Sequence, residues 1–201
     1  FVTKTSMLKK LKIFLKALVA YFVRLISKTK LGAYGFEIVL NTAMWVTQPV
    51  THGQTKLVFA VPNQLNRFRV DTFSSKEPET LEWIDSIPEG TVLWDVGANV
   101  GLYSCYAAKS RRCRVFSFEP SVFNLELLAR NIFINDLVDS VTIVPLPLSD
   151  SVHLNTLNMT STEWGGALST FGKSYGDDGQ TLKKIFEFSS VGMPMDEVVR
   201  L

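Results

Sequence analysis

The chain has 201 residues, of which 46% are hydrophobic, 20% charged and 11% aromatic, and its net charge at pH 7 is +2. This composition excludes a disordered tail, a collagen-like fibre and a disulfide-stapled miniprotein, and the length suits one domain with a short appendage. Two cysteines, Cys105 and Cys113, are too few for a disulfide framework and favour a reducing, cytoplasmic compartment.

The charges are unevenly distributed along the chain. Residues 1–30 carry eight Lys or Arg residues and no acid, whereas the remainder carries 13 bases and 19 acids. A mildly acidic body does not have the charge pattern of a nucleic-acid-binding domain, so we expect no nucleic-acid partner. The basic character belongs to the N-terminal segment alone.

Apolar residues recur at three- and four-residue spacing through residues 8–26, which predicts a basic amphipathic helix within residues 1–30. Its longest uncharged run, residues 17–23, has seven residues, whereas a membrane-spanning helix needs about 20 apolar residues. Two interpretations remain open. The helix packs on its own domain, or it lies peripherally on an anionic membrane surface.

Residues 31–75 predict a small β-rich subregion between this helix and the rest of the chain. The expected strands are 36–40, 56–60 and 67–72, with a turn at 51–54. A helix is then predicted over residues 77–87. Pro78 suits its first turn, and Pro88-Glu89-Gly90 ends it.

In the third region, residues 76–201, strands and helices alternate. Apolar strands are predicted at 91–96, 114–118 and 141–148, and helices at 102–109 and 122–135. This alternation predicts an α/β fold with a parallel sheet that helices cover on both faces. After residue 150 the pattern changes. Strands at 152–157 and 184–188 flank a polar, glycine-rich loop over 158–181, and we expect the two strands to form a β-hairpin.

Two acidic residues mark the most informative pattern in this region. Asp95 precedes a glycine turn, Gly97-Ala98-Asn99-Val100-Gly101, and Glu119 follows the next strand, directly before Pro120. Both turns come at the carboxyl ends of parallel strands, where open α/β sheets bind ligands. Glycine at positions 97 and 101 lets the main chain pass close to a bound molecule.

The acids indicate the class of ligand. A dinucleotide site uses Gly-x-Gly-x-x-Gly with pyrophosphate at a helix N-terminus, but the spacing here is Gly97-x-x-x-Gly101. Asp95 would repel a pyrophosphate and suits S-adenosylmethionine, which carries a sulfonium and an ammonium and no phosphate. Glu119, 24 residues later, would accept hydrogen bonds from both ribose hydroxyls. In the alternative interpretation, Asp95 caps the turn or the helix and Glu119 is a solvated strand end.

The sequence resembles the FkbM-type methyltransferases over residues 55–201. Six segments carry the resemblance: Lys76-Glu77-Pro78-Glu79-Thr80-Leu81, Asp95-Val-Gly-Ala-Asn-Val-Gly101, Phe118-Glu119-Pro120, Asn131-x-x-x-Asn135, Leu148-Ser149-Asp150 and Trp164-Gly165-Gly166. The resemblance implies a class I, Rossmann-like fold, with S-adenosylmethionine as methyl donor. It further implies O-methylation of a hydroxyl on a small-molecule acceptor, namely a sugar, glycan or natural product.

The same resemblance implies roles for individual residues. The amino-acid half of the cofactor would be lined by Asp95, Gly97, Asn99 and Gly101, with Ala98 among the cofactor-binding residues. Glu119 would hold the ribose, and the adenine would lie near Pro120, Ser149 and Asp150. No residue is assigned as the general base. Because no Cys/His cluster has metal-ligand spacing, we expect no metal site.

The family pattern continues with a strand of the form Lys-Ile-Asp-Val-Glu-Gly, in a seven-stranded sheet of order 3-2-1-4-5-7-6. Because only the first three of those strands are recognisable here, we expect an incomplete domain in which strand 91–96 is an exposed sheet edge. Two alternative functions remain. The chain is an NAD(P)-binding Rossmann oxidoreductase, or it is a catalytically silent adenosyl-binding module.

Overall fold

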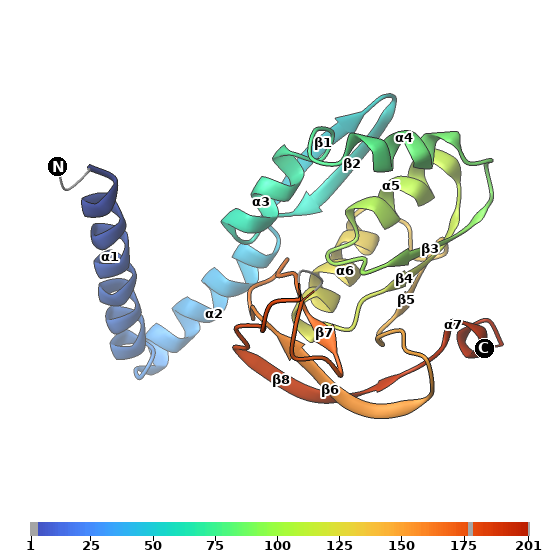
Figure 1. Ribbon diagram of the computed structural model, residues 1–201. Helices are drawn as coiled ribbons and strands as arrows, with labels where there is room; N and C mark the ends of the chain where they lie inside the picture. The colour runs from blue at the N-terminus through green and yellow to red at the C-terminus, as the bar shows by residue number, and fades with distance from the viewer. Residues whose placement is uncertain (1–3, 177–178, 201) are drawn as a thin grey trace. The chain divides into compact units, whose positions relative to one another are not determined.

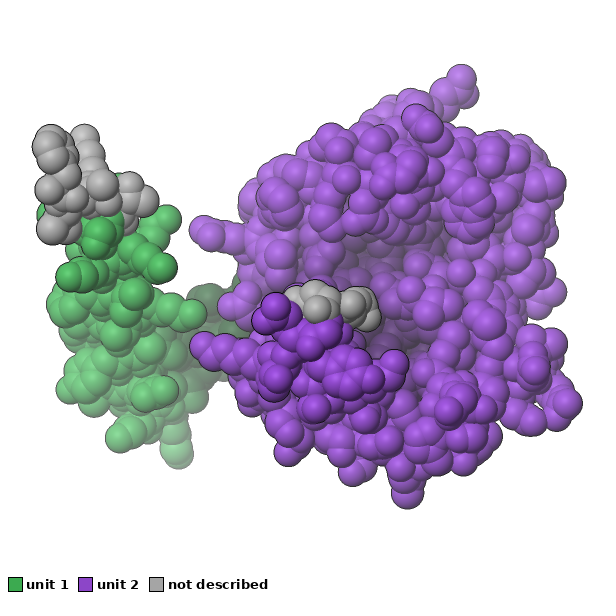
Figure 2. All heavy atoms as spheres, in the orientation of Figure 1, with its two compact units in different colours: residues 1–45 green, residues 46–201 purple. Residues whose placement is uncertain are grey.

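The computed structural model describes residues 4–176 and 179–200, and the chain forms two compact units, residues 1–45 and 46–201 (Figures 1 and 2). Residues 1–3 of the predicted N-terminal segment, residues 177–178 of the predicted polar loop and residue 201 lie outside this description. None of the described helices has the length and apolar content needed to cross a membrane.

Unit 1 consists of two helices, α1 (Lys4–Ile26) and α2 (Lys30–Met44). The predicted N-terminal helix is confirmed by α1. The predicted strand 36–40 is wrong, because these residues lie inside α2. Helix α2 is capped by Thr29, whose hydroxyl accepts a 3.0 Å hydrogen bond from the N–H of Gly32. The aromatic and β-branched residues of segment 36–40 favour a strand only weakly, and the capped helix overrides that preference.

Unit 2 begins with an antiparallel hairpin of β1 (Thr47–His52) and β2 (Thr55–Ala60), in which Thr47 pairs with Ala60. The predicted strand 56–60 is confirmed, but its partner is β1 rather than segment 36–40. Pro49 makes β1 hard to recognise in the sequence, because proline is confined to edge strands. Strand β1 is such an edge, since it pairs with β2 alone among the described residues.

The predicted strand 67–72 is also wrong. Helix α3 (Gln64–Asp71) covers residues 67–71, and Thr72 caps its C-terminus. Its N-terminal cap is Asn63, whose side-chain oxygen accepts a 2.8 Å hydrogen bond from the N–H of Asn66. The alternation of Phe68 and Val70 with charged residues imitates a strand in the sequence, but it is only a few residues long.

The central sheet has three parallel strands in the order β3-β4-β5. Their bounds are β3 (Val92–Val96), β4 (Arg114–Phe118) and β5 (Val141–Val144), and the helices between and before them are α4 (Pro78–Ser86), α5 (Leu102–Arg111) and α6 (Val122–Ile134). The predicted elements are confirmed to within a few residues, except that β5 ends four residues before Leu148. Val96 pairs with Phe118, and Phe118 pairs with Val144, so the three strands end at the same edge.

The hydrophobic core joins one face of this sheet to the helices α4, α5 and α6, and it extends to β2 and α3. Figure 1 shows how these elements are arranged. Leu93, Val115 and Val141 contribute from the strands. On the other face, Val92 and Val96 are 52% and 56% exposed. The prediction that helices cover both faces is therefore wrong for the described part of the chain. Strand β3 pairs with β4 alone there, as expected for a sheet edge.

A second, antiparallel sheet follows, in the order β7-β6-β8. Its strands are β6 (His153–Met159), β7 (Thr170–Phe171) and β8 (Phe186–Gly192), and a short helix, α7 (Met195–Val198), comes after it. The predicted hairpin is confirmed, with Leu157 opposite Phe188, although β8 extends further toward the C-terminus than expected. The loop between β6 and β7 contributes to the site described below.

Asn131 of α6 and Asn135, which caps the C-terminus of that helix, join α6 to the β1–β2 hairpin. Asn131 accepts a 2.8 Å hydrogen bond from the N–H of Ala60 and donates to the carbonyl of Val100 at 2.8 Å. Asn135 accepts from the N–H of Val58 and donates to the carbonyl of the same residue. These side chains satisfy the main-chain groups along one edge of β2, which would otherwise be buried without partners. The Asn131-x-x-x-Asn135 spacing is therefore structural.

Candidate functional site

The glycine turn after β3 is held against the end of β4. The N–H groups of Gly97 and Ala98 both donate to the carbonyl of Phe118, each at 2.9 Å. Gly97 has a φ of +84°, and a Cβ built on it would meet no atom within 4 Å. Glycine is therefore required here by the backbone conformation, and the space beside it is open.

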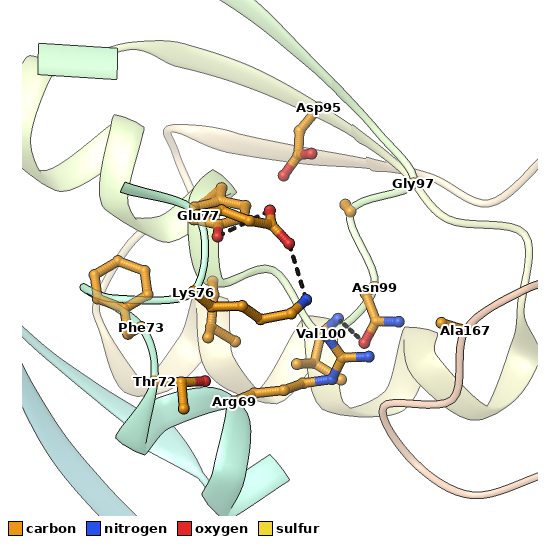
Figure 3. A pocket seen from close by; sticks show the side chains of 13 residues that line it. Arg69, Thr72, Phe73, Lys76, Glu77, Asp95, Gly97, Asn99, Val100 and Ala167 are labelled. Carbon is orange, nitrogen blue, oxygen red and sulfur yellow. Dashed lines mark hydrogen bonds and ion pairs between the residues drawn. The ribbon is translucent and has the colours of Figure 1, made fainter. Parts of the chain in front are cut away.

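Asp95 lies near the end of β3 and is held by α5. The hydroxyl of Ser104 donates to its carboxylate at 2.5 Å, and the hydroxyl of Ser117 donates to Ser104 at 2.7 Å. Burial raises the pKa of Asp95, and the hydrogen bonds from Ser104 offset part of that rise. Figure 3 shows the Asp95 side chain pointing into a cavity beside the glycine turn.

Glu119 follows β4 and is 5% exposed. Its carboxylate accepts hydrogen bonds from the N–H of Asn99 and the N–H of Ser121, each at 2.8 Å, and from the amide of Asn124 at 3.4 Å. Burial raises the pKa of Glu119, while these three donors act in the opposite direction. Because a carboxylate offers about four acceptor positions, Glu119 keeps capacity for a further donor.

The cavity beside Asp95 has a volume of about 250 Å³ and carries both signs of charge (Figure 3). Its cations are Arg69 and Lys76, and Glu77 supplies a second carboxylate. Lys76 and Glu77 form an ion pair at 2.8 Å, and the hydroxyl of Tyr103 donates to Glu77 at 3.1 Å. We call this space the charged cavity.

A second cavity of about 330 Å³ adjoins the first along the glycine turn. Gly97, Asn99 and Ala167 line both. Glu119 and Asn124 are polar groups of the second cavity, and its apolar lining includes Pro120, Leu146, Pro147, Leu148, Leu157 and Phe171. We call this space the apolar cavity. The two acids predicted from the sequence therefore line adjacent cavities on the two sides of one turn.

The loop Trp164–Gly166 is fixed beside both cavities by side chains from other elements. The carbonyl of Gly166 accepts hydrogen bonds from the amides of Asn99 and Asn124, at 2.8 and 3.0 Å. Arg69 donates to the carbonyl of Gly165, and Asn124 accepts from the Gly165 N–H at 2.9 Å. The main-chain groups of these two glycines are thus held by side chains, which tie the β6–β7 loop to the glycine turn.

The structure brings Asp95, Gly97, Ala98, Asn99, Glu119 and Pro120 together at the two cavities. Gly101 is placed differently. It is buried, and a Cβ there would lie 2.4 Å from a methyl carbon of Leu128, so its place in the structure is the contact between helices. Ser149 and Asp150 are not among the residues that line the two cavities, although Leu146–Leu148 line the apolar cavity.

Several residues of the site were not predicted from the sequence. Arg69, Lys76 and Tyr103 line the charged cavity, and Asn124 joins Glu119 to the Gly165–Gly166 loop. Lys76 belongs to a segment that carried the family resemblance, but the resemblance gave this residue no role. Arg69 gave no signal, because it lies in a helix that the sequence pattern had predicted to be a strand.

Part of the chain is similar in sequence to a protein that is named a methyltransferase. The methyltransferase sdnD of Sordaria araneosa is 33% identical over 78 residues, which is 38% of this chain. The chain spans 29% of the length of that relative. No family model matches the chain.

Solved structures of methyltransferases resemble parts of the chain at low similarity. A precorrin-6y C5,15-methyltransferase from Geobacter metallireducens has a TM-score of 0.30 and 24% identity, covering 34% of this chain and 36% of that one. A SAM-dependent methyltransferase from Geobacter sulfurreducens, in complex with S-adenosyl-L-homocysteine, has a TM-score of 0.32 and 17% identity, covering 43% and 39%.

Proposed function

We propose that this chain binds S-adenosylmethionine and belongs to a methyltransferase. The observation that carries the proposal is the pair of acids, Asp95 and Glu119, on adjacent cavities that share Gly97. One cavity is charged and the other is mostly apolar, which matches the two halves of this cofactor. The relative with 33% identity over 78 residues is named a methyltransferase, in agreement with this assignment.

The charged cavity suits the amino-acid half of the cofactor. A methionyl group carries one ammonium and one carboxylate, and the cavity offers Asp95 for the first and Lys76 with Arg69 for the second. The apolar cavity suits the adenosine half. Glu119 lines this cavity and would accept hydrogen bonds from the ribose, while Pro120 and Leu146–Leu148 would offer apolar surface to the adenine. The cofactor supplies a methyl group on a positively charged sulfur, and the chain binds and orients it.

The same groups argue against a dinucleotide. A pyrophosphate beside the glycine turn would face Asp95, which is held there by Ser104, and would leave two negative groups side by side. An NAD(P)-dependent oxidoreductase is therefore the weaker candidate. A silent adenosyl-binding module differs from a methyltransferase in turnover, not in the cofactor site.

The acceptor is proposed from the sequence resemblance to FkbM-type enzymes. It would be a hydroxyl of a sugar, glycan or natural product. The methyl group would be presented near Gly97 and Asn99, which line both cavities and therefore mark where the two halves of the cofactor meet.

Calorimetric titration of the chain with S-adenosylhomocysteine and with NAD tests the proposal. We expect the first to bind and the second not to bind, and the reverse result would favour the oxidoreductase. Transfer of a labelled methyl group to a panel of sugar and natural-product hydroxyls then separates an enzyme from a silent module.

The two halves of the site can be tested separately with 5′-methylthioadenosine, which lacks the amino acid. Lys76→Met should weaken binding of S-adenosylhomocysteine and leave binding of 5′-methylthioadenosine unchanged. Lys56→Met, at an exposed position on β2, is the matched control. Equal weakening of both ligands by Lys76→Met would contradict the placement of the carboxylate in the charged cavity.

A further inference from the structure

Unit 1 exposes an unusual amount of apolar surface. No side chain described between residues 6 and 45 is buried. Large apolar residues of α1 are between 36% and 70% exposed, and Leu31 and Val39 of α2 are 82% and 60% exposed. Soluble monomers rarely show contiguous apolar surface of this extent without a partner. An isolated helix is also marginal in water, so a covering partner would help to stabilise both helices.

The residues of α1 are sorted by face. At 3.6 residues per turn, one side of the helix carries only apolar and aromatic side chains over its described length from Met7 onward. These are Met7, Leu8, Leu11, Phe14, Leu15, Leu18, Val19, Tyr21, Phe22, Leu25 and Ile26. Lys10 and Lys12 border this face, while Lys9, Lys16 and Arg24 lie on the opposite side. The long aliphatic stems of bordering lysines can lie along apolar surface while their ammonium groups stay at its boundary.

Helix α2 is apolar on most of its circumference. Its polar residues other than Thr42 form one narrow stripe of Lys30, Glu37 and Asn41.

The turn between the helices is tightly built. Thr29 caps α2, and a Cβ on Gly32 would lie 2.1 Å from the carbonyl oxygen of Ile26, so glycine is required at this position. Unit 1 is therefore two consecutive helices with a defined elbow (Figure 1).

We propose that unit 1 binds the surface of an anionic lipid bilayer, with the apolar face of α1 and the body of α2 inserted at the headgroup boundary. Charge complementarity selects this partner over a neutral one. Residues 1–30 hold eight bases and no acid, and unit 1 has a single acid, Glu37. An amphipathic helix with basic residues at its borders and on its polar face has the arrangement that lies in such an interface. This proposal is independent of the assignment of the cofactor site.

Co-flotation of the full chain with vesicles tests the proposal. We expect strong binding to phosphatidylcholine vesicles that contain phosphatidylserine, and at least tenfold weaker apparent binding to phosphatidylcholine alone. High salt should reduce binding to the anionic vesicles because it screens the basic residues. Absence of binding to either vesicle would overturn the proposal.

Two matched variants separate insertion from charge attraction. Leu15→Glu with Leu18→Glu places two acids on the apolar face of α1, and Ala17→Glu with Ala20→Glu places two acids on its opposite side. Both pairs change the net charge equally, so only insertion distinguishes them. We expect the first pair to lose binding by at least tenfold more than the second, with equal helix content by circular dichroism. Equal losses would overturn insertion.

The apolar face could instead cover a second copy of the chain. Sedimentation velocity distinguishes this case. A stable dimer that dissociates on Leu15→Glu with Leu18→Glu and does not bind vesicles would contradict the lipid assignment. A chain that sediments as a monomer and floats with anionic vesicles would support it.

Discussion

Glu119 accepts a 2.8 Å hydrogen bond from the main-chain N–H of Asn99, 20 residues away in the sequence. The same carboxylate accepts from Ser121, so it joins the glycine turn after β3 to the start of α6. The acid therefore has two roles to be separated. It orders the turn that separates the two cavities, and it is the acceptor that we propose for the ribose.

Glu119→Ala should weaken binding of S-adenosylhomocysteine by about 1.5–3 kcal/mol, the usual range for hydrogen bonds to a charged group. Titration calorimetry measures this as a dissociation constant raised by roughly tenfold to a hundredfold. Because Asn99 and Ser121 lose their acceptor, thermal unfolding must show that the variant is folded. Glu82→Ala, at an exposed position on α4, serves as the control. An unchanged dissociation constant in a folded variant would contradict the ribose assignment.

Gly97→Val should abolish cofactor binding while the chain still folds. A Cβ at this position meets no atom within 4 Å, so the valine side chain would extend into the space that we propose for the cofactor. The φ of +84° adds strain, which costs about 1–2 kcal/mol for a residue with a Cβ. Gly90→Val has the same kind of strain, at a φ of +75° with no atom within 4 Å of the added Cβ, and it lies outside both cavities. Retained binding by Gly97→Val would show that the turn does not contact the ligand.

Asp95 gives the stability of the chain a predictable pH dependence. Burial raises its folded pKa, so between its ordinary and its raised value the folded chain holds a proton that the unfolded chain releases. The wild type therefore loses stability relative to Asp95→Asn as the pH rises through this window, because the amide does not titrate. The free energy of unfolding of Asp95→Asn minus that of the wild type, measured with urea, should therefore be larger at about pH 7 than at about pH 4.

Asp139→Asn, at an exposed position, is the control for this series. Its difference from wild type should change less with pH. If the difference in free energy of unfolding between Asp95→Asn and the wild type is the same at about pH 4 and about pH 7, burial does not raise the pKa of Asp95. The Ser104 hydroxyl can rotate to suit either side chain, so the comparison changes the charge more than the hydrogen bonding.

The central part of the fold could be predicted because its sequence signals are local and agree with one another. Val92–Val96 is apolar except for Asp95, a glycine turn follows it directly, and the helix after it starts where the pattern changes period. Asp95 and Glu119 could be placed on one edge of the sheet because parallel strands end together. The ligand class that we propose for them was inferred from charge, without knowledge of their hydrogen-bond partners.

The N-terminal half of the prediction failed where local preference and tertiary context disagree. Segment 36–40 has strand-forming residues but lies in a helix that Thr29 caps, and Pro49 obscured a real strand. Lys76 and Arg69 reach the charged cavity from a segment distant in sequence from the glycine turn. Neither periodicity nor motif spacing predicts a contact between segments that are distant in sequence. Residues such as these are therefore identified only from the structure.

The edge strand β3 leads to the last prediction. Among the described residues it pairs with β4 alone, and Val92 and Val96 are 52% and 56% exposed on the face away from the core. An edge that presents main-chain groups beside apolar side chains favours association between copies. The chain should therefore bind the dye ANS and aggregate on warming. Val96→Lys should lower the aggregation rate, because a charge on an edge strand opposes pairing.

Val138→Lys changes a residue that is 58% exposed outside the sheet, so it should leave aggregation nearly unchanged. Unit 1 contributes equally to dye binding in all three proteins, and light scattering during a temperature ramp compares them directly. Equal aggregation of the two variants would show that the β3 edge does not drive association.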